Sequence, residues 1–149
     1  MVNQRKIFNT TWVSSRIFAL YLCFVILPLI TAVCIYIFFR PIKPIFFNIF
    51  KLINYALSIR LDANFDWLIY NVPDGLWAFS FTSFIKLVTR NDSLLIKRIY
   101  LISAVLIMFG YEFGQIFYLD GTFDSYDLIA TAIGIYLSVA LVKKMSVRK

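Results

Sequence analysis

The chain has 149 residues, of which 61% are hydrophobic and 15% charged, and its formal net charge is +7. Soluble domains are about half apolar and about a quarter charged, so this composition excludes a soluble globular protein and predicts one integral membrane domain over residues 1–149. Because the sequence has no histidine, it offers no Ser/His or Cys/His nucleophilic pair, and no metal or other cofactor is expected.

The first element in chain order is a membrane span expected over residues 17–39. This apolar run is too long for the core of a cleavable signal peptide, and no small-residue cleavage site ends it. Next comes a segment, residues 44–59, whose polar side chains gather on about a third of the helical circle, with Lys51 in its middle. It is expected to form an interfacial amphipathic helix, and a loop helix packed on the bundle is the alternative.

Three further spans follow, each interrupted by polar residues. The second is expected over residues 73–89, because Pro73 suits the first turn of a helix. The third is expected over 94–117, after a capping Asn-Asp-Ser turn, and the fourth over 125–142, after Asp124 as a cap. The fold expected is therefore all-α, with four transmembrane helices.

The distribution of charge predicts how this bundle is oriented. With both termini in the cytoplasm, the inside segments hold 11 basic residues and one acid, and the outside segments hold four basic residues and seven acids. The positive-inside rule favours that orientation. We therefore expect a multi-pass protein of the bacterial inner membrane, and nothing in the sequence indicates a nucleic acid or a nucleotide signal as partner.

The acidic residues gather at the expected outer end, where we predict a polar pathway or ligand pocket. Acids at helix N-termini are also favoured by the helix dipole alone, but Glu112 lies at the opposite helix end and inside an apolar run. An unpaired acid deep in a span costs about 3 kcal/mol, so Glu112 is expected to face other helices and hold a proton or a partner. The candidate residues are Asp74, Glu112, Gln115, Asp124 and Asp127.

Small residues recur at helical spacing on three of the expected spans. Such stripes let membrane helices approach closely, so they predict helix packing, or pore lining where an acid heads them. The stripes are Asp74, Ala78 and Thr82 on the second span, Ser103, Gly110 and Gly114 on the third, and Asp127, Thr131, Gly134 and Ser138 on the fourth.

Several of these polar positions follow a known order. Asp74 stands in VPDGLW, Glu112 begins E-x-x-Q, a GTFD turn follows, and Asp127 precedes Gly134 by seven residues. Over roughly residues 72–141 this order resembles the VanZ-like family of small bacterial membrane proteins. The Lys and His that often follow the first Asp in that family, and the Arg common in its last turn, are absent here. The resemblance implies a polytopic inner-membrane protein, in some members linked to resistance against lipophilic glycopeptides, and supplies no established reaction.

Two functions are open from the sequence, and neither is enzymatic. The first is a homo-oligomer whose acid-headed stripes line an ion-conducting pore, as in a channel-like effector of a phage-defence module. The alternative is an envelope or drug-tolerance protein that binds lipid headgroups or cationic amphiphiles at an acidic outer pocket. An intramembrane aspartic protease is disfavoured because the G-x-G-D signature is absent. The expected partners are the lipid bilayer, further copies of the chain, and cations or lipid headgroups.

Overall fold

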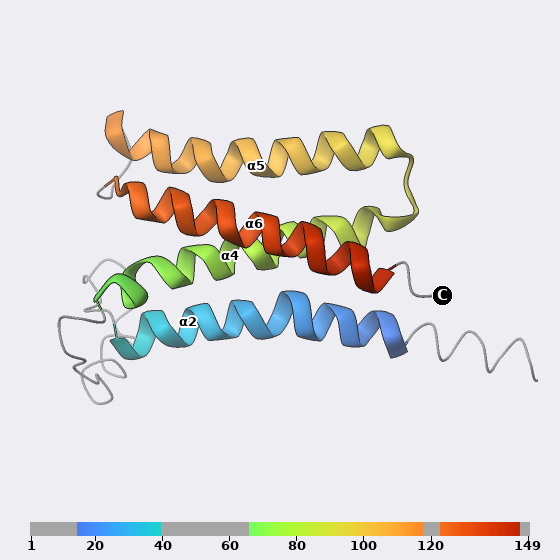
Figure 1. Ribbon diagram of the computed structural model, residues 1–149, viewed down its shortest axis with the longest axis horizontal. Coiled ribbons are helices and arrows are strands. Elements are labelled where there is room, and N and C mark those ends of the chain that lie inside the picture. Colours follow the sequence, from blue (N-terminus) through green and yellow to red (C-terminus); the bar gives the residue numbers. More distant parts are fainter. Residues whose placement is uncertain (1–14, 40–65, 118–122, 147–149) are drawn as a thin grey trace, which may run out of the picture.

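The computed structural model describes residues 15–39, 66–117 and 123–146, which form long helices joined by turns, with no strand among them (Figure 1). The all-helical prediction is confirmed for these residues, and the expected interfacial helix at 44–59 lies outside them. The first helix runs from Ser15 to Phe39 and includes a π-helical segment. The elements are η1 (Leu22–Ile26), α2 (Leu27–Phe39), α4 (Asp66–Val88), the 3-10 turn η3 (Thr89–Asn91), α5 (Leu94–Phe117) and α6 (Ser125–Ser146).

Three of these helices are long and apolar enough to cross a membrane. They are Ser15–Phe39, Leu94–Phe117 and Ser125–Val142, which correspond to the first, third and fourth expected spans. Helix α4, the second expected span, is not in this set, because Asn, Asp, Ser and Thr interrupt its apolar residues.

Helix α4 begins at Asp66, so the prediction that Pro73 opens this helix is wrong. Asp66 supplies the acid that suits a positive helix end, and Pro73 lies buried inside the helix, seven residues later. Membrane helices tolerate internal proline because neighbouring groups bond the freed backbone. The two expected caps are present: Ser93 Oγ accepts from the Ile96 amide at 3.4 Å, and Asp124 Oδ1 accepts from the Tyr126 amide at 2.9 Å.

Successive long helices run in opposite directions and lie side by side (Figure 1). Ser15 and the end of α6 therefore share one end of the bundle, while the start of α4 and the end of α5 share the other. The charges of the described residues separate between the two halves. We call one the acidic half (Asp66, Asp74, Glu112, Asp124, Asp127) and the other the basic half (Arg16, Lys86, Arg90, Lys97, Arg98, with the one acid Asp92).

Helix α4 is the centre of the bundle, since it contacts α2, α5 and α6, and its contact with α6 is the most extensive. The buried interior is small and largely polar, whereas Phe, Leu, Ile and Trp side chains dominate the surface. Lipid tails are as apolar as leucine, so a bundle that exposes its apolar residues and pairs its polar ones inside suits a bilayer. The buried polar residues are Asn71, Ser80, Thr82, Ser83, Thr89, Glu112, Thr131 and Ser138.

Candidate functional site: a carboxyl cluster and a lateral pocket

Two glycines bring the backbones of α4 and α6 together. A Cβ atom at Gly134 would overlap the carbonyl oxygen of Gly75 and lie 3.1 Å from the Phe79 amide nitrogen. A Cβ atom at Gly75 would lie 3.0 Å from the carbonyl oxygen of Ala130. Small residues allow such approach between membrane helices. The α4–α6 contact is therefore closed at this level, with no space for a conduit between the two backbones.

Polar side chains continue along the same contact toward the basic half. The hydroxyls of Ser83 and Ser138, both fully buried, lie 2.8 Å apart, and Lys86 Nζ donates to the Val139 carbonyl at 2.7 Å. Thr82 is also fully buried, and its Oγ1 has no hydrogen-bond partner. These residues give α4 and α6 a polar contact surface from one half of the bundle to the other, which we call the α4–α6 seam.

On the α5 side of the seam lies a group of acids, Glu112, Asp124 and Asp127, that we call the carboxyl cluster. Glu112 is only 8% exposed although α5 is otherwise mostly exposed, and its Oε2 has no hydrogen-bond partner. The charged groups that act on it are Asp127 and then Asp124, both at the start of α6. Glu112 on α5, Asp127 in the first turn of α6 and Asp124 just before α6 thus place three carboxyls in the acidic half, two of them within electrostatic range of Glu112.

The other candidates from the sequence fall into two groups. Those on α4 and α6 are in the interior: Ala78, Thr82, Thr131, Gly134 and Ser138 are buried, and Asp74 is half-buried. Those on α5 are less enclosed, since Gln115 and Gly114 are half-buried while Ser103 and Gly110 are exposed. A Cβ atom at Gly110 would meet nothing within 4 Å, so this part of the α5 stripe packs against no other described helix. No group of three acidic or cysteine residues in the described ranges is arranged to hold a metal ion.

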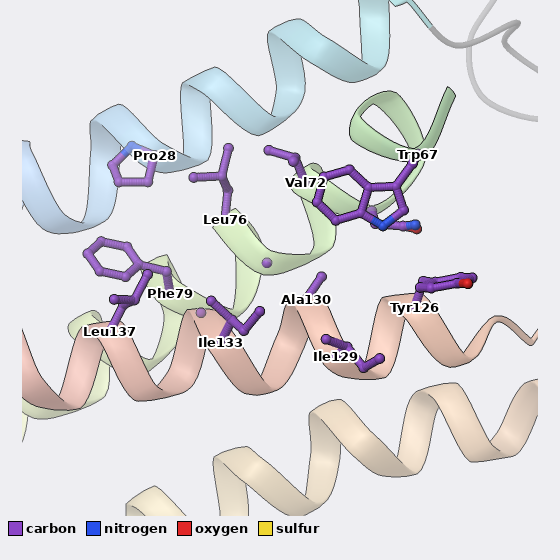
Figure 2. Close-up of a pocket in the computed structure, with 13 residues that line it drawn as sticks. Pro28, Trp67, Val72, Leu76, Phe79, Tyr126, Ile129, Ala130, Ile133 and Leu137 are labelled. Atoms are coloured by element: carbon purple, nitrogen blue, oxygen red, sulfur yellow. The ribbon is translucent and has the colours of Figure 1, made fainter. Parts of the chain in front are cut away.

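A pocket of about 560 Å³ lies on the other side of the seam, between α2, α4 and α6 (Figure 2). Side chains of α4 and α6 face each other across it, Pro28 closes it from α2, and α5 lies beyond α6, away from the pocket. Its lining is almost wholly apolar: Pro28, Trp67, Asn71, Val72, Gly75, Leu76, Phe79, Tyr126, Ile129, Ala130, Ile133, Gly134 and Leu137.

The polar group buried at this pocket is Asn71. Its side chain is 2% exposed, and its Oδ1 has no hydrogen-bond partner. This pocket was not predicted from the sequence, since Gly134 alone among its lining residues was a candidate. A signal was available, because Trp67, Asn71 and Gly75 recur every four residues and so share one face of α4.

No protein-family model, curated protein or solved structure matches the chain. The resemblance to the VanZ-like family therefore stays a prediction from the motif residues.

Proposed function

We propose that this chain is a non-enzymatic, multi-pass protein of the bacterial inner membrane that conducts small cations as a homo-oligomer. The observation that carries the proposal is the buried carboxyl of Glu112, which lies within electrostatic range of Asp127 and Asp124 and has an oxygen without a hydrogen-bond partner. Ionisable groups within membrane helices are costly, and in known proteins they mark ion and proton pathways. Acid groups at a mouth favour cations over anions.

In this proposal all four long helices span the membrane, α4 included. Its 23 residues are about 34 Å long at 1.5 Å per residue, which suffices for a hydrocarbon core of about 30 Å. Its polar residues Ser80, Thr82 and Ser83 are buried against neighbouring helices, while its exposed residues include Trp77, Phe81, Phe84 and Val88. Mean hydropathy counts both faces of α4, whereas lipid would meet only the apolar one.

The orientation we propose places the acidic half outside and the basic half in the cytoplasm, with both termini cytoplasmic. Four antiparallel passes bring the first and last helix ends to the same side, and basic residues near span ends favour the cytoplasmic side. The carboxyl cluster would then open toward the periplasm.

The pathway we propose runs between subunits and not through one of them. The backbones of α4 and α6 touch at Gly75 and Gly134, so a single subunit offers no open route along its seam. Helix α5, which carries Glu112, buries only Ala104 and Glu112, so its long faces are available to a second copy of the chain.

Cation flux into proteoliposomes, measured with Glu112→Gln, tests this function. We expect flux to fall about tenfold, which corresponds to ~1.4 kcal/mol, within the ~4 kcal/mol that a unit charge at about 4 Å provides near a protein surface. The matched control is Asp66→Asn, an exposed acid in the first turn of α4, which should keep wild-type flux. Equal flux in wild type and Glu112→Gln, or a strictly monomeric mass in detergent, would overturn the proposal.

A further inference from the structure

The lateral pocket has the size and lining of a site for an apolar ligand. Its volume of about 560 Å³ lies in the range of roughly 300–1,000 Å³ that is usual for ligand sites. On α6 it extends from Tyr126 to Leu137, about 16 Å at 1.5 Å per residue. Ile129, Ile133 and Leu137 are also partly exposed on the outside of α6, so the pocket is open to the surrounding membrane. A hydrocarbon chain can enter it sideways.

Asn71 determines what the occupant must offer besides hydrocarbon. A buried amide oxygen without a partner destabilises a protein, because its bonds to water are lost and nothing replaces them. Asn71 lies one turn from Trp67, at the end of the pocket in the acidic half. An occupant with a hydrogen-bond donor at this end would supply the missing partner of Oδ1.

The charge of the acidic half selects among headgroups that can donate. Its described residues include the carboxyl side chains of Asp66, Asp74, Glu112, Asp124 and Asp127, and the outside segments as counted from the sequence, with seven acids and four basic residues, are net acidic. An anionic glycerol headgroup has hydroxyl donors but is repelled by this charge. A choline headgroup carries a positive charge but has no N–H. An ammonium headgroup has both the positive charge and three N–H donors.

From these three observations we infer that the pocket binds a phospholipid with an ammonium headgroup, phosphatidylethanolamine in a bacterial membrane. One acyl chain lies between α4 and α6 toward Pro28, and the ammonium group donates to Asn71 Oδ1. Amphiphile binding, which was the alternative function expected from the sequence, is thereby assigned to a pocket whose lining residues, apart from Gly134, were not candidates from the sequence. The inference shares the charge of the acidic half with the proposed function, but its binding residues are those of the pocket, so lipid retention and cation flux can fail separately.

Competition among lipids tests the inference directly. The full chain is reconstituted in nanodiscs with equal amounts of phosphatidylethanolamine, phosphatidylcholine and phosphatidylglycerol of the same acyl chains, and the lipids retained after mild detergent extraction are counted by native mass spectrometry. We expect phosphatidylethanolamine to be retained about tenfold over either competitor. In Asn71→Leu, which removes the amide at similar volume, the preference over phosphatidylcholine should fall close to one.

A second pair of variants locates the bound lipid. Ile133→Trp places a larger ring in the pocket from the exposed side of α6 and should lower the number of retained lipids. Ile30→Trp makes the same change on the exposed surface of α2, outside the pocket, and should leave that number unchanged. The inference is overturned by equal retention of the ethanolamine and choline lipids, by preference for the glycerol lipid, by an unchanged preference in Asn71→Leu, or by equal effects of the two tryptophans. Each of these results leaves the flux test of Glu112 unaffected.

Discussion

At the residue scale, two glycines that both lie inside a helix differ in how closely a neighbouring helix approaches them. Gly134 abuts the backbone of Gly75, whereas Gly110 has open space. We expect Gly134→Ala to lower the free energy of unfolding by about 1–3 kcal/mol, because the added methyl group forces α6 away from α4. Gly110→Ala should leave stability unchanged or raise it by up to ~1 kcal/mol, because alanine is the better helix former.

Thermal unfolding in detergent, followed by circular dichroism, measures both substitutions. The Gly110 variant serves as the control for adding a methyl group to a membrane helix. If Gly134→Ala were as stable as wild type, the close approach of the two backbones would be wrong.

The burial of a single residue could be predicted from the sequence where a polar or charged side chain interrupts an apolar run. Glu112 breaks an apolar run, and the cost of a charge in lipid implied that it faces protein, where the structure finds it buried. Ser103 and Gly110 fit a small-residue stripe but are exposed, because spacing gives a shared face and does not say whether a neighbour covers it. Asn71 was missed because one amide near a helix start is common at a membrane surface.

At the element scale, the seam between α4 and α6 contains a buried serine pair that permits a double-mutant cycle. Ser83→Ala and Ser138→Ala each remove one side of the 2.8 Å hydrogen bond, and the double variant removes both. We expect a coupling energy of about 0.6 kcal/mol, the average for hydrogen bonds between membrane helices, and at most about 1.7 kcal/mol. Equilibrium unfolding in mixed micelles gives the four stabilities.

The control for this cycle is Ser103→Ala on α5, whose side chain is exposed. Combined with Ser83→Ala it should show no coupling, because Ser103 is exposed on α5 whereas Ser83 is buried against α6. A coupling energy near zero for the serine pair itself would show that the seam is held by shape alone.

Element boundaries were predictable where apolar runs end in capping residues, and less so where proline suggested a start. Helix α5 occupies residues 94–117 as expected, since Ser93 caps a continuous apolar run. Helix α4 starts at Asp66, earlier than expected, and continues through Pro73. Local turn preferences did not predict this, because they do not include the packing of neighbouring helices around a buried proline. The polar residues of α4 lower its mean hydropathy, so composition alone does not identify this helix as a span.

At the scale of the whole molecule, α6 contributes to two separate surfaces. Toward α5 it contributes Asp124 and Asp127 to the carboxyl cluster, and toward α2 it contributes Ile133 and Leu137 to the lateral pocket. The α4–α6 seam separates these two surfaces, so a substitution in one should leave the other intact. Cation flux and lipid retention are therefore expected to respond to different residues.

The separation of charge between the two halves leads to a prediction of orientation. In a background without Cys23 and Cys34, single cysteines at two exposed positions mark the two halves: Ser93→Cys in the basic half and Ser125→Cys in the acidic half. A membrane-impermeant maleimide should label Ser125→Cys in spheroplasts and Ser93→Cys only in inverted vesicles, because basic segments are retained in the cytoplasm. The reverse pattern would place the carboxyl cluster on the cytoplasmic side. Labelling of both cysteines from the same side would mean that α5, the long helix between Ser93 and Ser125, does not cross the membrane.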